Sequence, residues 1–128
     1  MPALPLADLA ALREAWLTNL TAELPAARNL RERIHADPHL SGDEEATALL
    51  LEDALDLRME RIAQTGRIGR IGPAGGPSVM LRAEMDALPV EEATGAPYAS
   101  TNGAMHACGH DVHMAALVAC VRAARGLD

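Results

Sequence analysis

Metal-binding side chains are concentrated in residues 105–113, Met-His-Ala-Cys-Gly-His-Asp-Val-His, and this stretch restricts how the chain can fold. It holds most of the histidine and one of the two cysteines of the 128-residue sequence. Cys108 and His110 flank Gly109, so their side chains converge only where the backbone bends, and glycine permits that bend. The sequence therefore predicts a sharp turn here, followed by a helix over about 112–125. The apolar side chains on one side of that helix are Met114, Leu117, Val118 and Val121.

A second group of candidate ligands, Glu84 and Asp86, closes an apolar run upstream of the first. Residues 78–83, Ser-Val-Met-Leu-Arg-Ala, are typical of a short strand in the centre of a sheet. Side chains two positions apart share one face of a strand, so both carboxylates would point the same way if the strand continues. Two groups of ligand-type side chains, at a strand end and before a helix, are what a metallohydrolase needs. The alternative is a solvated loop.

The residues of the 105–113 segment admit more than one role. A thiolate and a neutral imidazole, as in Cys108 and His110, are good ligands for ions such as Zn²⁺, Mn²⁺ or Ni²⁺. Asp111 could cap the following helix, or its carboxylate could orient a ligating histidine. A structural zinc site is an alternative, with His106 and His113 completing a set of four. Structural zinc ligands usually come in two separated pairs, however, and these four are crowded into a single turn.

Hydrophobic periodicity predicts the remaining helices. Apolar residues at steps of three and four indicate a helix over 9–24, which Pro25 should break or kink because proline cannot donate an intrahelical hydrogen bond. The helix should resume through Leu30 and Ile34 and end before Pro38. Ser41, with Glu44 three positions later, has the spacing of an N-terminal capping box. The helix that follows is expected to bury one set of side chains: Ala46, Leu49, Leu50 and Ala54.

Alternating segments over 58–62 and 67–71 predict a hairpin, and residues 87–104 read as a long loop with four glycines or prolines. Glu91 and Glu92 are expected to be solvated in this loop. The whole pattern predicts a single α/β domain over 1–128, with a mixed sheet flanked by helices.

Composition excludes several functional classes. The net charge is −7 and there is no basic run, which makes nucleic acid and anionic membranes poor partners. No apolar stretch approaches the ~20 residues of a membrane span. Residues 1–10 lack the basic region of a signal peptide, so a cytoplasmic location is expected. Cys108 and Cys120 could form a disulfide, but in a soluble acidic chain they are expected to stay reduced.

Four segments, in order, resemble one metallohydrolase family. Residues 33–45 resemble its motif R-x-H-x-x-P-E-L-S-x-x-E, and residues 81–89 resemble L-R-A-D-M-D-A-L-P. Residues 92–100 resemble E-x-T-G-x-P-Y-x-S, and residues 103–113 resemble G-x-M-H-A-C-G-H-D-x-H. The family comprises the N-acyl-amino-acid, hippurate and indole-acetyl-amino-acid amidohydrolases, which are related to aminoacylase and glutamate carboxypeptidase.

The resemblance implies a site with two divalent ions, of zinc, manganese, nickel or cobalt, in which Cys108 and His110 are metal ligands. Asp86 matches the aspartate that supports the metal cluster. The side chains of Glu84, His106, Asp111 and His113 could contact the ligands instead of the metal. The implied reaction is hydrolysis of an N-acyl amino acid or related amide by a metal-held water.

The resemblance also implies an incomplete enzyme. Glu84 stands where the family usually has Asp, and His39 stands where it usually has Glu. Family members are much longer, so residues 1–128 correspond to the N-terminal part of a zinc-peptidase-like catalytic domain. The general base and the lid or dimerisation domain are expected outside this chain, as is any homo-oligomer interface. A catalytically inactive metal-binding fragment and a structural zinc module remain the alternatives.

Overall fold

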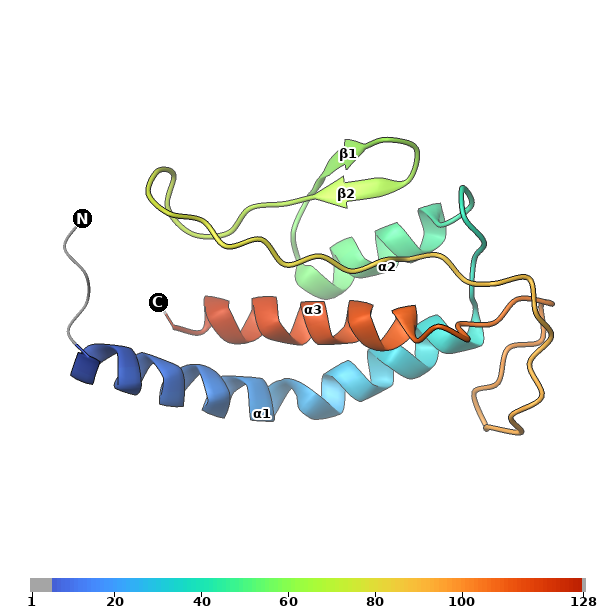
Figure 1. The fold of residues 1–128 in the computed structure, drawn as a ribbon, viewed down its shortest axis with the longest axis horizontal. Helices are drawn as coiled ribbons and strands as arrows, with labels where there is room; N and C mark the ends of the chain where they lie inside the picture. Colours follow the sequence, from blue (N-terminus) through green and yellow to red (C-terminus); the bar gives the residue numbers. More distant parts are fainter. Residues whose placement is uncertain (1–5, 128) are drawn as a thin grey trace.

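The computed structural model describes residues 6–127, which form three helices and one hairpin. In chain order these are α1 (Leu6–Ala36), α2 (Glu45–Leu55), β1 (Glu60–Ile62), β2 (Gly66–Ile68) and α3 (His110–Arg125). Helices α1 and α3 lie side by side along the long axis of the molecule, and α2 packs against α3 (Figure 1). The loop of residues 87–104 lies at the end of the molecule where α1 ends and α3 begins (Figure 1).

The core lies between the three helices. Its buried members are Leu30 and Ile34 of α1, Leu51 and Leu55 of α2, and Met114 and Val118 of α3. The α3 face is the one that its periodicity predicts, with Leu117 and Val121 packed against the same cluster. These aliphatic side chains supply the apolar burial that stabilises a chain with few aromatic residues.

The predicted buried face of α2 is only partly correct, since Leu50 and Ala54 pack against the core but Ala46 and Leu49 are exposed. Thr47, Ala48, Leu51 and Leu55 are buried, whereas Leu49 is 53 % exposed. Three consecutive leucines, residues 49–51, fit more than one helical face, and packing against the other helices selects between them. The predicted capping box is also absent, because α2 begins at Glu45 with Glu44 as its N-cap. The Glu44 carboxylate instead accepts hydrogen bonds from the Gly42 amide and the Thr65 hydroxyl.

Pro25 does not end its helix, contrary to expectation. Helix α1 continues through it from Leu6 to Ala36. Proline removes one backbone donor and frees the carbonyl of the residue four positions earlier. Pro25 and Thr21 are both exposed, so water can hydrate that carbonyl. Burial of Leu30 and Ile34 against the other helices then favours helix on the far side of the proline.

The hairpin is confirmed, but the strand predicted over 78–83 is not formed. Strands β1 and β2 pair antiparallel with Glu60 opposite Ile68. Residues 78–83 are extended and belong to no sheet of the described chain, and Val79 and Met80 are 91 % and 79 % exposed. A strand needs a neighbour to accept its backbone hydrogen bonds, and the hairpin does not supply one. The fold is thus an incomplete α/β domain. Within residues 6–127, no helix has the length and apolar character needed to cross a membrane.

Candidate metal centre

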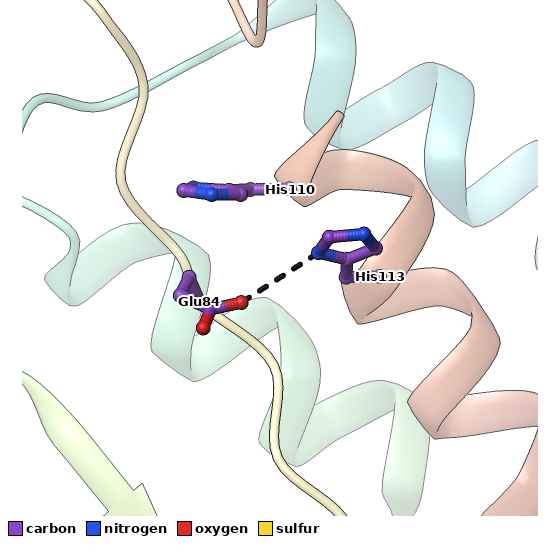
Figure 2. Close-up of side chains that lie close together, drawn as sticks. All are labelled: Glu84, His110 and His113. Atoms are coloured by element: carbon purple, nitrogen blue, oxygen red, sulfur yellow. Dashed lines mark ion pairs between the residues drawn. The ribbon is translucent and has the colours of Figure 1, made fainter. Parts of the chain in front are cut away.

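Three potential ligands from two separate segments meet near the start of α3. Glu84 comes from the extended segment, and His110 and His113 come from the first turn of α3 (Figure 2). One ligand atom of each lies within 4.8 Å of the others. Glu84 Oε2 is 3.6 Å from His113 Nδ1, and the two imidazole centroids are 5.8 Å apart. Residues three apart on a helix are neighbours on its surface, which is why the two rings face Glu84 together.

Asp86 selects the tautomer of the His110 ring. The backbone carbonyl of Asp86 lies 2.8 Å from His110 Nδ1, and a carboxylate oxygen of Asp86 lies 3.3 Å from the same atom. A carbonyl only accepts, so Nδ1 must donate a proton to it. In a neutral imidazole this leaves the lone pair on Nε2, which is the arrangement that a ligating histidine needs.

Glu84 is ionised at neutral pH. Its pKa is lowered, first by a hydrogen bond from its own backbone amide and then, against the opposing effect of desolvation, by the positive charge of Arg82. Arg82 also forms an ion pair with the Glu84 carboxylate. A cation bound here would therefore contact one negatively charged carboxylate and two imidazole rings.

Cys108 is exposed and lies outside this group of three. The bend predicted next to it is present, because Gly109 has φ 82° and serves as the N-cap of α3. Asp111 is therefore not the helix cap. The structural zinc alternative would require His106 and Cys108 to lie close to His110 and His113. Among residues 6–127, these four side chains do not form a cluster of potential metal ligands.

His106 is buried beneath the centre, with 3 % of its surface exposed. Neither ring nitrogen has a hydrogen-bond partner. Burial lowers the pKa of His106, because the charged form would lose its hydration. Buried imidazoles usually have a hydrogen-bond partner, and the described protein atoms do not supply one to His106.

The donor set fits a divalent cation. One carboxylate and two histidines are a common zinc ligand set, and two ligands of one tetrahedral ion lie about 3.4 Å apart. The ligand atoms of the three side chains lie within 4.8 Å of one another. Cys108, for which the sequence predicts a ligand role, is exposed and stands two residues before His110.

A buried ionic network lies beside the centre, and sequence reasoning missed most of it. Arg31 Nε and His35 Nδ1 contact the same oxygen of Asp111, at 2.6 and 2.8 Å. His35 Nε2 lies 3.0 Å from Glu92, and Arg31 donates to the Tyr98 hydroxyl at 2.8 Å. Arg31 and His35 stand four apart on one predicted helix, and that spacing was the only signal that could have paired them.

Glu92 is not the solvated loop residue that the sequence suggested. Its side chain is fully buried. The Thr94 hydroxyl, the Ser100 amide and the His35 ring lower its pKa to about 2. The pKa of Asp111 is also lowered, because hydrogen bonds from His35 and Arg31 outweigh the opposing effect of burial. Both carboxylates are therefore charged, and they fasten the 87–104 loop to α1 and α3.

Residues 80–128, which contain all three converging ligands, match the sequence profile of peptidase family M20/M25/M40. The chain is similar to this family over that stretch. It is 47 % identical over 96 residues to the N-acetyl-L-cysteine deacetylase of Bacillus subtilis, covering 70 % of this chain and 23 % of that protein. It is 44 % identical over 94 residues to the N-acyl-L-amino acid amidohydrolase of Geobacillus stearothermophilus, covering 69 % of this chain and 25 % of that protein.

A solved structure shows the same relationship in three dimensions. The chain superposes with a TM-score of 0.70, at 33 % identity, on a protein described as an aminohydrolase from methicillin-resistant Staphylococcus aureus. The match covers 82 % of this chain and 30 % of that one. The chain thus spans about a quarter of the length of the curated relatives it matches. The M20 family is metal-dependent, which agrees with the ligand group at the start of α3.

Proposed function

We propose that this chain is the metal-binding, N-terminal portion of the catalytic domain of an amidohydrolase that cleaves N-acyl amino acids. One observation carries the proposal: candidate ligands from both sequence clusters converge inside the segment that matches the M20/M25/M40 family. The relatives named above act, by their names, on an acyl group attached to the nitrogen of an amino acid. An amide of that kind is therefore the substrate class we propose for the full-length protein.

The proposed ligands are Cys108 and His110, with Glu84 and His113 close enough to contribute or to orient them. Asp86 would hold the His110 ring through the hydrogen bond to Nδ1. A divalent ion of zinc, manganese, nickel or cobalt, one of two in the full-length enzyme, would supply Lewis acidity toward the acyl carbonyl. Arg82, paired with Glu84, would limit the net negative charge at the site.

The cytoplasm is the compartment we propose, with neither nucleic acid nor membrane as a partner. The free thiols of Cys108 and Cys120 suit a reducing environment, and a charge of −7 repels polyanions. A homo-oligomer of the full-length enzyme is part of the same proposal.

The test exchanges the matched stretch of the Geobacillus amidohydrolase for the corresponding stretch of this chain. We expect the chimera to release amino acid from N-acetyl substrates in a metal-dependent way, and Cys108→Ala in the chimera to remove that activity. Cys120→Ala, at the other cysteine, is the matched control and should change little. A well-folded chimera that binds metal without turnover would favour an inactive metal-binding segment instead.

The 128-residue chain alone provides a second test. Amide hydrolysis needs a proton shuttle beside the metal, and the buried, hydrogen-bonded Glu92 is not free to act as one. We expect the isolated chain to bind at most one divalent ion and to hydrolyse N-acetyl or N-benzoyl amino acids no faster than background. One tightly held, chelator-resistant Zn²⁺ would favour the structural zinc alternative.

A further inference from the structure

Two residues of α1 reach the metal centre through a single carboxylate. Arg31 and His35 lie one helical turn apart on the face of α1 that packs against α3. Both contact Oδ2 of Asp111, which is 1 % exposed. Asp111 is the second residue of α3 and follows His110 directly. The carboxylate that these two residues hold is therefore part of the same helical turn that carries the candidate ligands His110 and His113.

This contact restrains the first turn of α3. A rotation of that turn would move both imidazoles relative to Glu84, and it would also break the two short hydrogen bonds to the Asp111 carboxylate. Within residues 6–127, the other side-chain hydrogen bond between this turn and a distant segment is the one from His110 to the Asp86 carbonyl. The turn is thus held from two sides, by Asp86 and by α1.

His35 is itself held in place. Its Nε2 lies 3.0 Å from Glu92, whose other oxygen accepts a hydrogen bond from the Ser100 amide. The ring packs edge-on against Tyr98, with the centroids 5.5 Å apart. Its Nδ1 is therefore aimed at Asp111 by contacts on the opposite side of the ring.

We propose that Arg31 and His35 are positioning residues that act through Asp111 to place His110 and His113 for metal binding. The proposal rests on the metal-binding function proposed above and extends it to residues outside the ligand segment. The proposal gives a role at the metal centre to the motif of residues 33–45, which contains His35. No side chain of that motif belongs to the group of Glu84, His110 and His113.

Two amide substitutions at His35 separate positioning from simple stabilisation. The amide nitrogen of Asn occupies the place of Nδ1, so His35→Asn can keep the hydrogen bond to Asp111 and lose that to Glu92. The amide nitrogen of Gln occupies the place of Nε2, so His35→Gln can keep Glu92 and lose Asp111. Each variant loses one hydrogen bond to a buried carboxylate, so the two are matched in their expected cost to stability.

The measurements are Zn²⁺ affinity by calorimetry and the ring proton resonances of His110 and His113 in the metal-free chain. Loss of a contact that orients metal ligands weakens metal binding about 10- to 100-fold, so we expect this for His35→Gln and a change within about twofold for His35→Asn. The His110 and His113 resonances should shift in His35→Gln and stay close to wild type in His35→Asn.

Equal losses of affinity and equal resonance shifts in the two variants would overturn the proposal, because a purely structural role affects both alike. Wild-type affinity and resonances in His35→Gln would overturn it as well. A wild-type chain that does not bind Zn²⁺, together with a chimera that has no metal-dependent activity, would overturn the proposed function. In that case resonance shifts confined to His35→Gln would still support the positioning of both rings by α1.

Discussion

Two neighbouring groups of histidines and carboxylates in this molecule differ in how deeply they are buried and in how closely their members contact one another. In the buried network, the side chains of His35, Asp111 and Glu92 are at most 6 % exposed, and their contacts are 2.8 to 3.0 Å long. In the group at the start of α3, the Glu84 and His113 side chains are 32 % and 56 % exposed, with 3.6 Å between their nearest atoms. The same residue types thus form a closed network in one place and an open group in the other.

The difference separates a structural role of histidines and carboxylates from a ligand-binding role. A buried charge is stable only when partners replace its lost hydration. The short contacts of the closed network therefore fasten the helices and the loop together, although Oδ1 of Asp111 has no hydrogen-bond partner there. The side chains of the open group are accessible to water, and the distance between their ligand atoms is one that a cation could bridge. Asp111, in the same turn as His110 and His113, connects the two groups.

The largest effect on stability is expected from removing the Asp111 carboxylate, which the two groups share. Asp111→Ala leaves Arg31 and His35 without their common partner in a buried place, and it should destabilise the chain by about 3 kcal/mol. Glu84→Ala, in the open group, should change stability by no more than about 0.5 kcal/mol. Urea unfolding at pH 7 measures both. Similar losses in the two variants would contradict the distinction between closed and open groups.

Metal binding is expected to depend directly on the proposed ligands. Cys108→Ala and His110→Ala should each weaken Zn²⁺ or Co²⁺ binding at least tenfold, which is about 1.4 kcal/mol. His39→Ala is the control, because this histidine contacts Thr47 away from the open group. Titration of the three variants is the measurement. Equal affinities in all of them would show that the metal is held elsewhere.

The smallest effect is expected from acid titration of the closed network. The pKa of Glu92 falls from an ordinary value of 4.5 to about 2 in the folded chain. A lowered folded-state pKa contributes stability above the unfolded value, and this contribution is lost as the pH falls from about 4.5 toward 2. Glu92→Gln should therefore lose less stability than wild type over that window. Parallel stability curves in urea unfolding would show that the hydrogen bonds to Glu92 do not favour its charged form.

Local sequence patterns predicted the features that depend on neighbouring residues. The bend at Gly109 follows from the conformational freedom of glycine, and the hairpin follows from two alternating segments close together in the chain. The buried face of α3 follows from its apolar period. The ligand types at Cys108, His110 and Glu84 were also evident from the sequence, because their chemistry does not depend on packing.

Only the tertiary structure decided which of these residues meet. His35 and Glu92 are 57 positions apart, and no local pattern shows that they share a hydrogen bond with each other and a network with Asp111. Residues 78–83 have the composition of a central strand, yet a strand forms only where another segment accepts its hydrogen bonds. The sequence by itself determined the chemical groups and the local bends, because these depend on nearest neighbours. Packing of α1 against α3 decided which carboxylates became buried partners and which stayed open, because burial is a property of the whole fold.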